Sequence, residues 1–93
     1  MIDTIIKRDG RAVPFSIDKI AQAINKAIEA CGSGNYEEAL ELSQQVVNHI
    51  EASGNTRPTV EEIQDTVEKV LIESGHARTA KKFILYRSER SRV

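Results

Sequence analysis

Two short segments suited to β-strands lie on either side of an Asp-Gly pair near the start of the chain. Thr4-Ile5-Ile6 precedes Asp9-Gly10, and Ala12-Val13-Pro14-Phe15 follows it. Asp-Gly is a strong hairpin-turn signal, because both positions tolerate a positive φ. We therefore predict a β-hairpin over about residues 4–15. An isolated two-stranded hairpin is barely stable in water, so the rest of the chain has to provide a surface on which it packs.

Apolar residues at helical spacing follow the hairpin directly. Ser16 is a favourable N-cap for the first helix, and Thr59 with Glu62 predicts a capping box at the start of the third. The predicted helices cover about residues 17–31, 36–52, 60–74 and 78–90. Their predicted inward stripes are Ile17, Ile20, Ile24, Ala27, Ile28 and Cys31; Tyr36, Leu40, Ser43, Val47 and Ile50; Val60, Ile63, Val67, Val70 and Leu71; and Ala80, Phe83, Ile84 and Arg87. The sequence thus predicts an α+β, mainly α fold.

The length of 93 residues leaves room for one core, so we expect a single domain over residues 1–93. No apolar run reaches the roughly 18 residues of a membrane helix, and the start lacks the pattern of a secretory signal. Cys31 is the only cysteine, which excludes an internal disulfide and a cysteine-based zinc site. We expect a cytoplasmic protein. The charged residues 88–93 look like a junction, which suggests a segment of a larger protein.

The formal net charge of −1 conceals a strong segregation of charge along the chain. Residues 1–26 have five cations and three acids, residues 27–76 have two cations and ten acids, and residues 77–93 have six cations and one acid. The three parts therefore carry +2, −8 and +5. If the fold brings the two ends together, they form a cationic patch.

Few residues in the chain point to catalysis. There is no P-loop motif, and we interpret Gly32-Ser33-Gly34 as a flexible connection. His49 and His76 have no cysteine ligands near them and no nucleophile placed by the sequence, so an isolated enzyme is the least favoured class. The acidic residues at the helix starts complement the helix dipoles and are interpreted as solvated faces.

The remaining cluster of interest lies at the N-terminus. Lys7-Arg8 ends the first predicted strand, and Lys19 lies in the first turn of the following helix. Beside the Ser16 cap these cations would form an anion site suited to a polyphosphate, because unpaired N–H groups and a partial positive charge occur at a helix start. The alternative is that they are solvated or pair with Asp9 and Asp18.

Three blocks of sequence resemble the ATP-cone family. The first runs from Ile5 to Ile20 and joins a turn, a helix cap and three cations at fixed offsets; the others run from Pro58 to Glu68 and from Ala80 to Arg87. The resemblance implies a hairpin capping a small four-helix bundle. Such domains are found at the N-terminus of ribonucleotide reductases. Residues 60–70 and 84–90 resemble most the regulatory domain of anaerobic ribonucleoside-triphosphate reductases.

The resemblance also implies a ligand and its site. ATP or dATP would bind under the hairpin as an allosteric effector, and Mg²⁺ could accompany the triphosphate. Lys7, Arg8 and Lys19 would meet the phosphates, Ser16 the sugar, and Arg87 would close the phosphate side. Ile5, Phe15 and Ile20 would form apolar walls for adenine, and Val60, Ile63 and Gln64 would approach the base, with Gln64 at its polar edge.

The implied partners are a reductase catalytic domain or subunit and a further copy of the chain. The alternative function is a degenerate cone that acts as a helical oligomerisation or interaction module; three retained cations argue against it. Nucleic-acid binding is weaker still, because the four aromatic residues lie on predicted core stripes rather than on a stacking platform. The preference between ATP and dATP is left open by the sequence.

Overall fold

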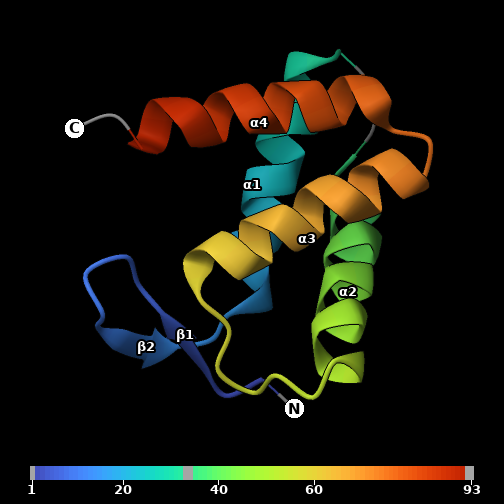
Figure 1. The fold of residues 1–93 in the computed structure, drawn as a ribbon. Coiled ribbons are helices and arrows are strands. Elements are labelled where there is room, and N and C mark those ends of the chain that lie inside the picture. The colour runs from blue at the N-terminus through green and yellow to red at the C-terminus, as the bar shows by residue number, and fades with distance from the viewer. Residues whose placement is uncertain (1, 33–34, 92–93) are drawn as a thin grey trace.

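The computed structural model describes residues 2–32 and 35–91, with side chains through residue 87. Two strands, β1 (Thr4–Ile6) and β2 (Ala12–Pro14), precede four helices. The helices are α1 (Ile17–Ala30), α2 (Tyr36–Ala52), α3 (Val60–Glu73) and α4 (Ala77–Ser91). The predicted fold class, a hairpin followed by four helices, is confirmed (Figure 1). Positions 33 and 34 of the predicted loop after the first helix lie outside the described residues.

The hairpin is attached to the segment that leads into α3. Its strands pair antiparallel, with Ile5 opposite Val13, and Gly10 takes a φ of 87° in the turn. The N–H of Ile6 donates to the carbonyl of Pro58 at 3.0 Å, and Ile6 forms a parallel bridge with Thr59. These backbone bonds provide the support that an isolated hairpin lacks, and they fix the hairpin against the start of α3.

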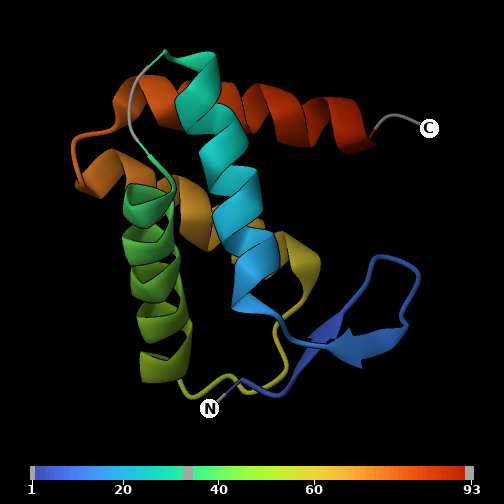
Figure 2. The ribbon, with the colours of Figure 1, turned by 180° about the vertical axis from the view of Figure 1, so that it is seen from behind.

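The four helices form one bundle around a common core. Figures 1 and 2 show α1 and α2 side by side, with α3 and α4 lying across them and the hairpin beside the first turns of α1 and α3. The main contacts join α1 to α2 and α4, and α3 to the same two helices. Ile5 and Phe15 of the hairpin segment pack on this core. The core consists of Ile2, Ile20, Ile24, Ala27, Ile28, Ala39, Leu42, Val46, Val47, Ile50, Ile63, Val67, Val70, Leu71, Ala80 and Phe83.

The helix starts differ in how they are capped. Thr59 Oγ1 accepts from the N–H of Glu62 at 3.1 Å, and a carboxylate oxygen of Glu62 accepts from the N–H of Thr59 at 2.9 Å, so the predicted capping box is confirmed. Asn35 Oδ1 accepts from the N–H of Glu38 at 2.9 Å at the start of α2. Ser16 occupies the N-cap of α1 as predicted, but its hydroxyl makes no capping hydrogen bond.

The predicted inward face of α2 was wrong at its first two positions. Tyr36 is 41% exposed and Leu40 is 36% exposed. The buried face is centred instead on Ala39, Leu42 and Val46, together with the predicted Ser43, Val47 and Ile50. The buried arc is centred about one residue away from the predicted one, because α2 packs against both α1 and α3.

Two further expectations for core residues were also wrong. Ile84 is 42% exposed, because α4 uses Thr79, Ala80 and Phe83 to pack on the bundle. Cys31 is the C-cap of α1 and only half-buried, with its sulfur 3.8 Å from Thr79 Oγ1. Cys31 therefore lies at a helix end at the edge of the core, and Ile84 lies on the exposed side of α4.

Candidate anion-binding groove

A hollow lies where the hairpin, α1, α3 and α4 meet. Its innermost part, here called the inner cavity, has a volume of about 160 Å³. Aliphatic and aromatic side chains from all four elements form most of its wall, and the ends of two lysines and one glutamine reach it. The lining residues are Ile5, Lys7, Lys19, Ile20, Ala23, Val60, Ile63, Gln64, Val67, Phe83 and Tyr86.

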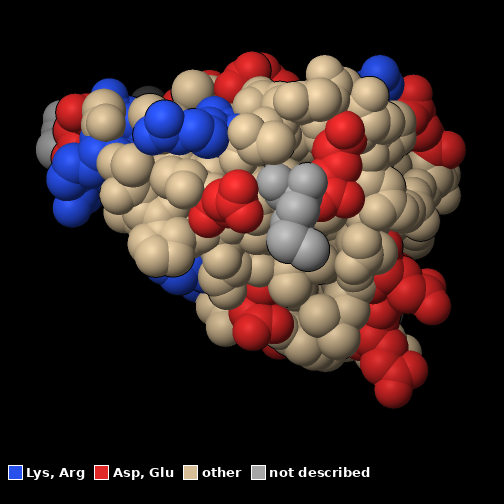
Figure 3. All heavy atoms as spheres, turned by 90° about the horizontal axis from the view of Figure 1, so that it is seen from below, with Lys and Arg blue, Asp and Glu red and all other residues tan. Residues whose placement is uncertain are grey.

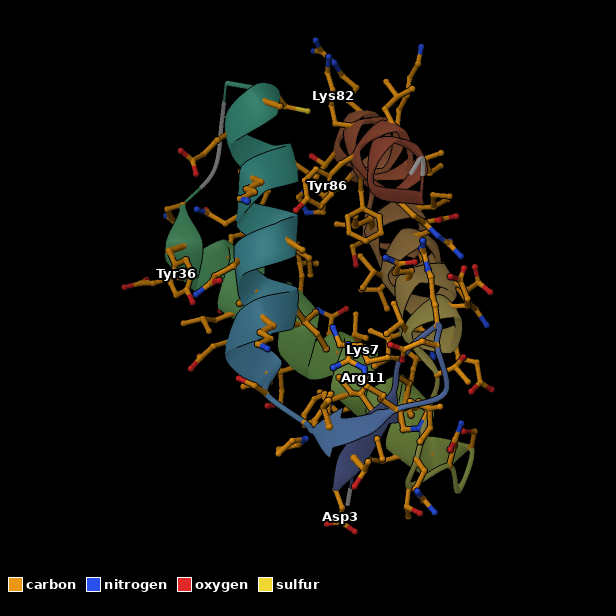
Figure 4. All side chains as sticks on the ribbon, turned by 90° about the vertical axis from the view of Figure 1, so that its left-hand side faces the viewer. Asp3, Lys7, Arg11, Tyr36, Lys82 and Tyr86 are labelled. Carbon is orange, nitrogen blue, oxygen red and sulfur yellow. The ribbon has the colours of Figure 1, made fainter. Side chains whose placement is uncertain are left out.

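Two further hollows, both more polar, adjoin the inner cavity. The hairpin cavity, about 300 Å³, is lined by Lys7, Arg8, Asp9, Arg11, Val60 and Gln64. The α1 cavity, about 400 Å³, is lined by Lys7, Lys19, Gln22, Ala23, Lys26, Gln64 and Tyr86. Lys7 and Gln64 line all three hollows, so we treat them as one groove with an apolar interior and a cationic rim. Figure 4 looks into this region, with Lys7 and Arg11 at the hairpin end and Tyr86 on α4.

Local structure explains why these side chains converge. The Asp9-Gly10 turn reverses the chain directly after Lys7, and the N–H of Lys7 donates to the carbonyl of Arg11 at 2.8 Å. Lys19, Ala23 and Lys26 are four and three residues apart, so they share one face of α1. Val60 and Gln64 are likewise one turn apart on α3. Each wall of the groove is therefore one face of a regular element.

The two lysines at the centre of the rim have no carboxylate partner among the residues that the structure describes. Within the described ranges, no acid lies within ion-pair distance of Lys7 or Lys19. Asp9 pairs with Arg11 at 2.7 Å instead, and the backbone N–H and guanidinium of Arg11 hold the pKa of the Asp9 carboxyl below its usual value. The alternative that these lysines are neutralised by Asp9 or Asp18 therefore finds no support. Their charge faces the groove.

Arg8 and the third lysine of the rim, Lys26, are likewise engaged by neighbours. Arg8 Nε lies 2.6 Å from a carboxylate oxygen of Glu61, and Arg8 Nη2 donates to Gln64 Oε1 at 3.3 Å. Lys26 Nζ lies 5.5 Å from the centre of the Tyr86 ring, within cation–π range. A ligand in the groove would thus meet Lys7 and Lys19, which have no ion pair among the described residues, and Arg8, which is bound to Glu61.

The comparison with known families fits this arrangement. The family model of the ATP cone domain matches residues 3–92. The chain belongs to the ATP-cone family. This confirms the resemblance that rested on the blocks from Ile5 to Ile20, Pro58 to Glu68 and Ala80 to Arg87, and the match covers every element of the groove.

Curated relatives of the cone are reductases of more than one kind. The vitamin B12-dependent ribonucleoside-diphosphate reductase of Thermoplasma acidophilum is 43% identical over the whole chain, which covers 12% of that protein. The ribonucleoside-diphosphate reductase subunit alpha of Chlamydia muridarum is 38% identical, with 97% of the chain and 10% of that protein covered. The anaerobic ribonucleoside-triphosphate reductase of Salmonella typhimurium is 30% identical, with 97% and 12% covered. The chain spans about a tenth of the length of these relatives.

Most of the residues predicted for the cone's site line the groove, and three do not. Phe15 packs partly buried against the core, and Ser16 is half-buried at the N-cap of α1. The residues that the groove brings together are Ile5, Lys7, Arg8, Lys19, Ile20, Val60, Ile63 and Gln64. They come from the hairpin, α1 and α3, and the predicted phosphate and adenine residues lie in adjoining parts of one groove.

Arg87 is the third exception, and its surroundings explain why. Its Nη1 donates to Asp65 Oδ1 at 2.8 Å, its Nη2 donates to Glu61 Oε2 at 2.7 Å, and it also pairs with Glu68. Only 18% of its side chain is exposed. Partial burial opposes ionisation, but the hydrogen bonds to the three carboxylates outweigh it and raise the pKa of Arg87. Arg87 is therefore held on the acidic face of α3 and does not line the groove.

The N-terminal and C-terminal cations that the structure describes line different hollows, so they do not form one cationic patch. On the face shown in Figure 3, most Lys and Arg side chains gather toward the hairpin, and Asp and Glu prevail toward α2. The C-terminal cations Arg78, Lys81 and Lys82 line a different hollow at the first turns of α4. Among the side chains that the structure describes, the cations on the rim of the groove all come from the N-terminal part of the chain.

Several lining residues were missed by sequence reasoning. The spacing of Lys19, Ala23 and Lys26 on one helix face was a usable signal for α1. Phe83 was predicted only as core, and Tyr86, three residues further on α4, closes the groove from the other side. Its place depends on how α4 packs against α1, which no local pattern reports.

The described residues offer neither a cluster of metal ligands nor a membrane-spanning helix. No group of three or more His, Cys, Asp or Glu side chains among them is arranged to hold a metal ion. No helix in the described part of the chain has the length and apolar character needed to cross a bilayer.

Proposed function

We propose that the groove binds ATP or dATP, with adenine in the inner cavity and the phosphates on the cationic rim. The observation that carries this proposal is the shared lining: Lys7 and Gln64 belong both to an apolar hollow and to two basic ones. A ligand that fills all three needs a flat apolar part joined to a strongly anionic part. An adenine nucleotide has this combination, and ligand pockets combine apolar walls with a few placed polar groups in the same way.

The proposed adenine site is formed by aliphatic side chains from three elements. Ile5, Ile20, Val60 and Ile63 offer apolar surface, and the Gln64 amide offers both a donor and an acceptor for the polar edge of the base. Gln64 also accepts from Arg8 at 3.3 Å, which fixes the orientation of its amide. A fixed amide favours adenine over a base with the opposite donor and acceptor pattern.

The proposed phosphate site consists of Lys7, Lys19 and Arg8. Two unpaired ammonium groups and a guanidinium would offset most of the charge of a triphosphate, and charge-assisted hydrogen bonds are the stronger class. Mg²⁺ would come with the triphosphate, held by phosphate oxygens and water, because the described side chains supply no carboxylate cluster for it. Phe15, Ser16 and Arg87 are not included as direct ligand contacts.

We further propose that the domain regulates a ribonucleotide reductase in the cytoplasm, through an attached catalytic domain or subunit. ATP and dATP would shift activity only by the difference in their affinities for active and inactive arrangements, including arrangements that differ in oligomeric state. The anaerobic class stays a prediction from residues 60–70 and 84–90, since diphosphate reductases are among the relatives. Activity of the full-length protein with diphosphate and triphosphate substrates would decide the class.

One observation favours a second function, an interaction module. Ile72, Ile84 and Leu85 are exposed large apolar residues on α3 and α4. A cone that had lost its ligand would keep such a surface. Sedimentation with and without ATP separates the two functions: an association indifferent to nucleotide would favour the module.

Calorimetric titration of the chain with ATP, dATP and GTP tests the nucleotide proposal. We expect saturable heats with both adenine nucleotides and much weaker binding of GTP, whose base reverses the pattern at Gln64. The absence of heat and of any thermal shift at millimolar ATP would contradict the proposal.

A further inference from the structure

A chain of ion pairs connects the groove to α4. Glu61 uses one carboxylate oxygen for Arg8 Nε at 2.6 Å and the other for Arg87 Nη2 at 2.7 Å. Arg8 lies at the end of the hairpin, Glu61 in the first turn of α3, and Arg87 on α4. One carboxylate therefore joins three elements, and only the first of its two arginines lines the groove.

Two nitrogens of Arg8 are bonded to protein groups, and the third is available to a ligand in the hairpin cavity. A guanidinium has five N–H donors in a rigid fork. Nε is used by Glu61, and Nη2 donates to Gln64. Nη1 has no hydrogen-bond partner among the residues that the structure describes, and Arg8 lines the hairpin cavity with 40% of its side chain exposed. A phosphate could therefore bind Arg8 without displacing Glu61.

Glu61 is itself held in place by a well-anchored partner. Arg87 contacts Asp65 and Glu68 as well as Glu61, and its side chain is the least exposed of this cluster. The hydrogen bond from Arg87, helped by the charge of Arg8, keeps the pKa of Glu61 below its usual value. Glu61 is thus ionised at neutral pH and has little freedom to leave Arg8.

We propose that Glu61, fixed by Arg87, is the positioning residue that holds Arg8 toward the phosphates of the bound nucleotide. This inference rests on the proposed function of the groove. Arg87 would then act on the ligand from outside the groove, through Glu61. Because coupling between two sites is reciprocal, nucleotide bound at Arg8 would in turn stabilise the contact between α3 and α4.

The opposite role for Glu61 makes an opposite prediction. A carboxylate that competed with phosphate for Arg8 would weaken binding, so removing its charge would tighten it. A positioning carboxylate strengthens binding, so removing its charge loosens it. The sign of one measured change therefore separates the two roles.

The experiment compares ATP affinities of the chain and five variants by calorimetry. The variants are Glu61→Gln, Arg8→Ala, the double variant, Arg87→Lys, and the control Glu73→Ala, whose carboxylate lies on α3 away from the groove. We expect Glu61→Gln to weaken ATP binding about three- to tenfold, the size of one ordinary net hydrogen bond, because Glu61 acts on the phosphates only through Arg8. We expect the same change to have almost no effect when Arg8 is already alanine.

Arg87→Lys keeps the charge but offers no planar fork for three carboxylates, so it should weaken ATP binding in the same direction. The loss should shrink from ATP to ADP to AMP, because Arg8 meets phosphate and not base. Melting temperatures identify any variant that fails to fold. If either Glu61→Gln or Arg87→Lys fails to fold, the ATP affinity of the other one still tests the inference.

Three results would overturn the inference while leaving nucleotide binding intact. They are tighter binding by Glu61→Gln, an equal loss with and without Arg8, and a loss that is the same for ATP and AMP. If the unaltered chain does not bind ATP, the proposed function itself fails. Glu73→Ala should bind ATP like the unaltered chain.

Discussion

At the scale of single residues, the positions of Lys7 and Lys19 could be predicted from the sequence, and the position of Arg87 could not. Lys7 and Lys19 are placed by a turn and a helix start a few residues away, so their approach could be predicted from local signals. Arg87 was predicted to close the phosphate side, but its carboxylate partners lie 19 to 26 residues earlier in the chain. Such a pairing depends on how α3 and α4 pack, and no local pattern encodes it.

Lys7→Ala and Lys19→Ala should each weaken ATP binding about tenfold, because each removes an ammonium group that we propose contacts phosphate. Neither change should lower the melting temperature by more than a degree or two, because neither lysine has an ion pair to lose among the described residues. Titration calorimetry measures the first quantity and thermal unfolding the second. Lys69→Ala, an exposed lysine on α3 that lines none of the three hollows, is the matched control. Unchanged affinity in both groove variants would place the site elsewhere.

At the scale of elements, the ends of helices were easier to predict than their faces. The Thr59–Glu62 box has a signature only three residues long, and both of its hydrogen bonds form. The buried face of α2 was predicted about one residue out of phase at Tyr36 and Leu40. An amphipathic pattern gives the period of a helix, but the neighbouring helices decide which edge of the stripe is covered.

Thr59→Ala should destabilise the chain by about 1 kcal/mol, the usual cost of losing an N-cap side chain. For a domain of this size that is a fall of roughly 4–8 °C in melting temperature. Ser16→Ala is the control, since Ser16 occupies an N-cap without a capping hydrogen bond. Its melting temperature should stay close to that of the unaltered chain. Equal losses in the two variants would mean that the capping box contributes nothing specific.

At the scale of the whole molecule, the segregated charge has two consequences that the net charge hides. The N-terminal cations form the rim of the groove, and the acidic face of α3 is stabilised by arginines from both ends of the chain, Arg8 and Arg87. The sequence predicted the segregation but not the second pairing. The sequence left open whether the basic ends meet, and in the structure Arg78, Lys81 and Lys82 line a separate hollow of about 360 Å³.

The ion pairs on α3 predict how stability depends on pH. Arg87 and then Arg8 lower the pKa of Glu61 in the folded state, and the Thr59 N–H lowers that of Glu62. A lowered folded pKa means that the unfolded state binds protons more readily. Stability is therefore full above the ordinary glutamate value of about 4.3 and falls as the pH drops through and below it.

Urea unfolding between pH 6 and pH 3 measures this dependence. Glu61→Gln should make the free energy of unfolding fall less steeply at acid pH (the acid limb), because it removes one of the groups whose pKa differs between the folded and unfolded states. Glu41→Gln, which removes an exposed carboxylate without an ion pair among the described residues, should leave the limb unchanged. An identical acid limb in all three proteins would contradict the role assigned to the α3 carboxylates.

A crystal structure of the chain grown with ATP tests the central claim most directly. We predict the adenine between Ile20 and Val60, with Gln64 at its polar edge, and the phosphates within hydrogen-bond distance of Lys7, Lys19 and Arg8. ATP bound instead at the hollow of Arg78, Lys81 and Lys82, with the groove unchanged, would contradict the account.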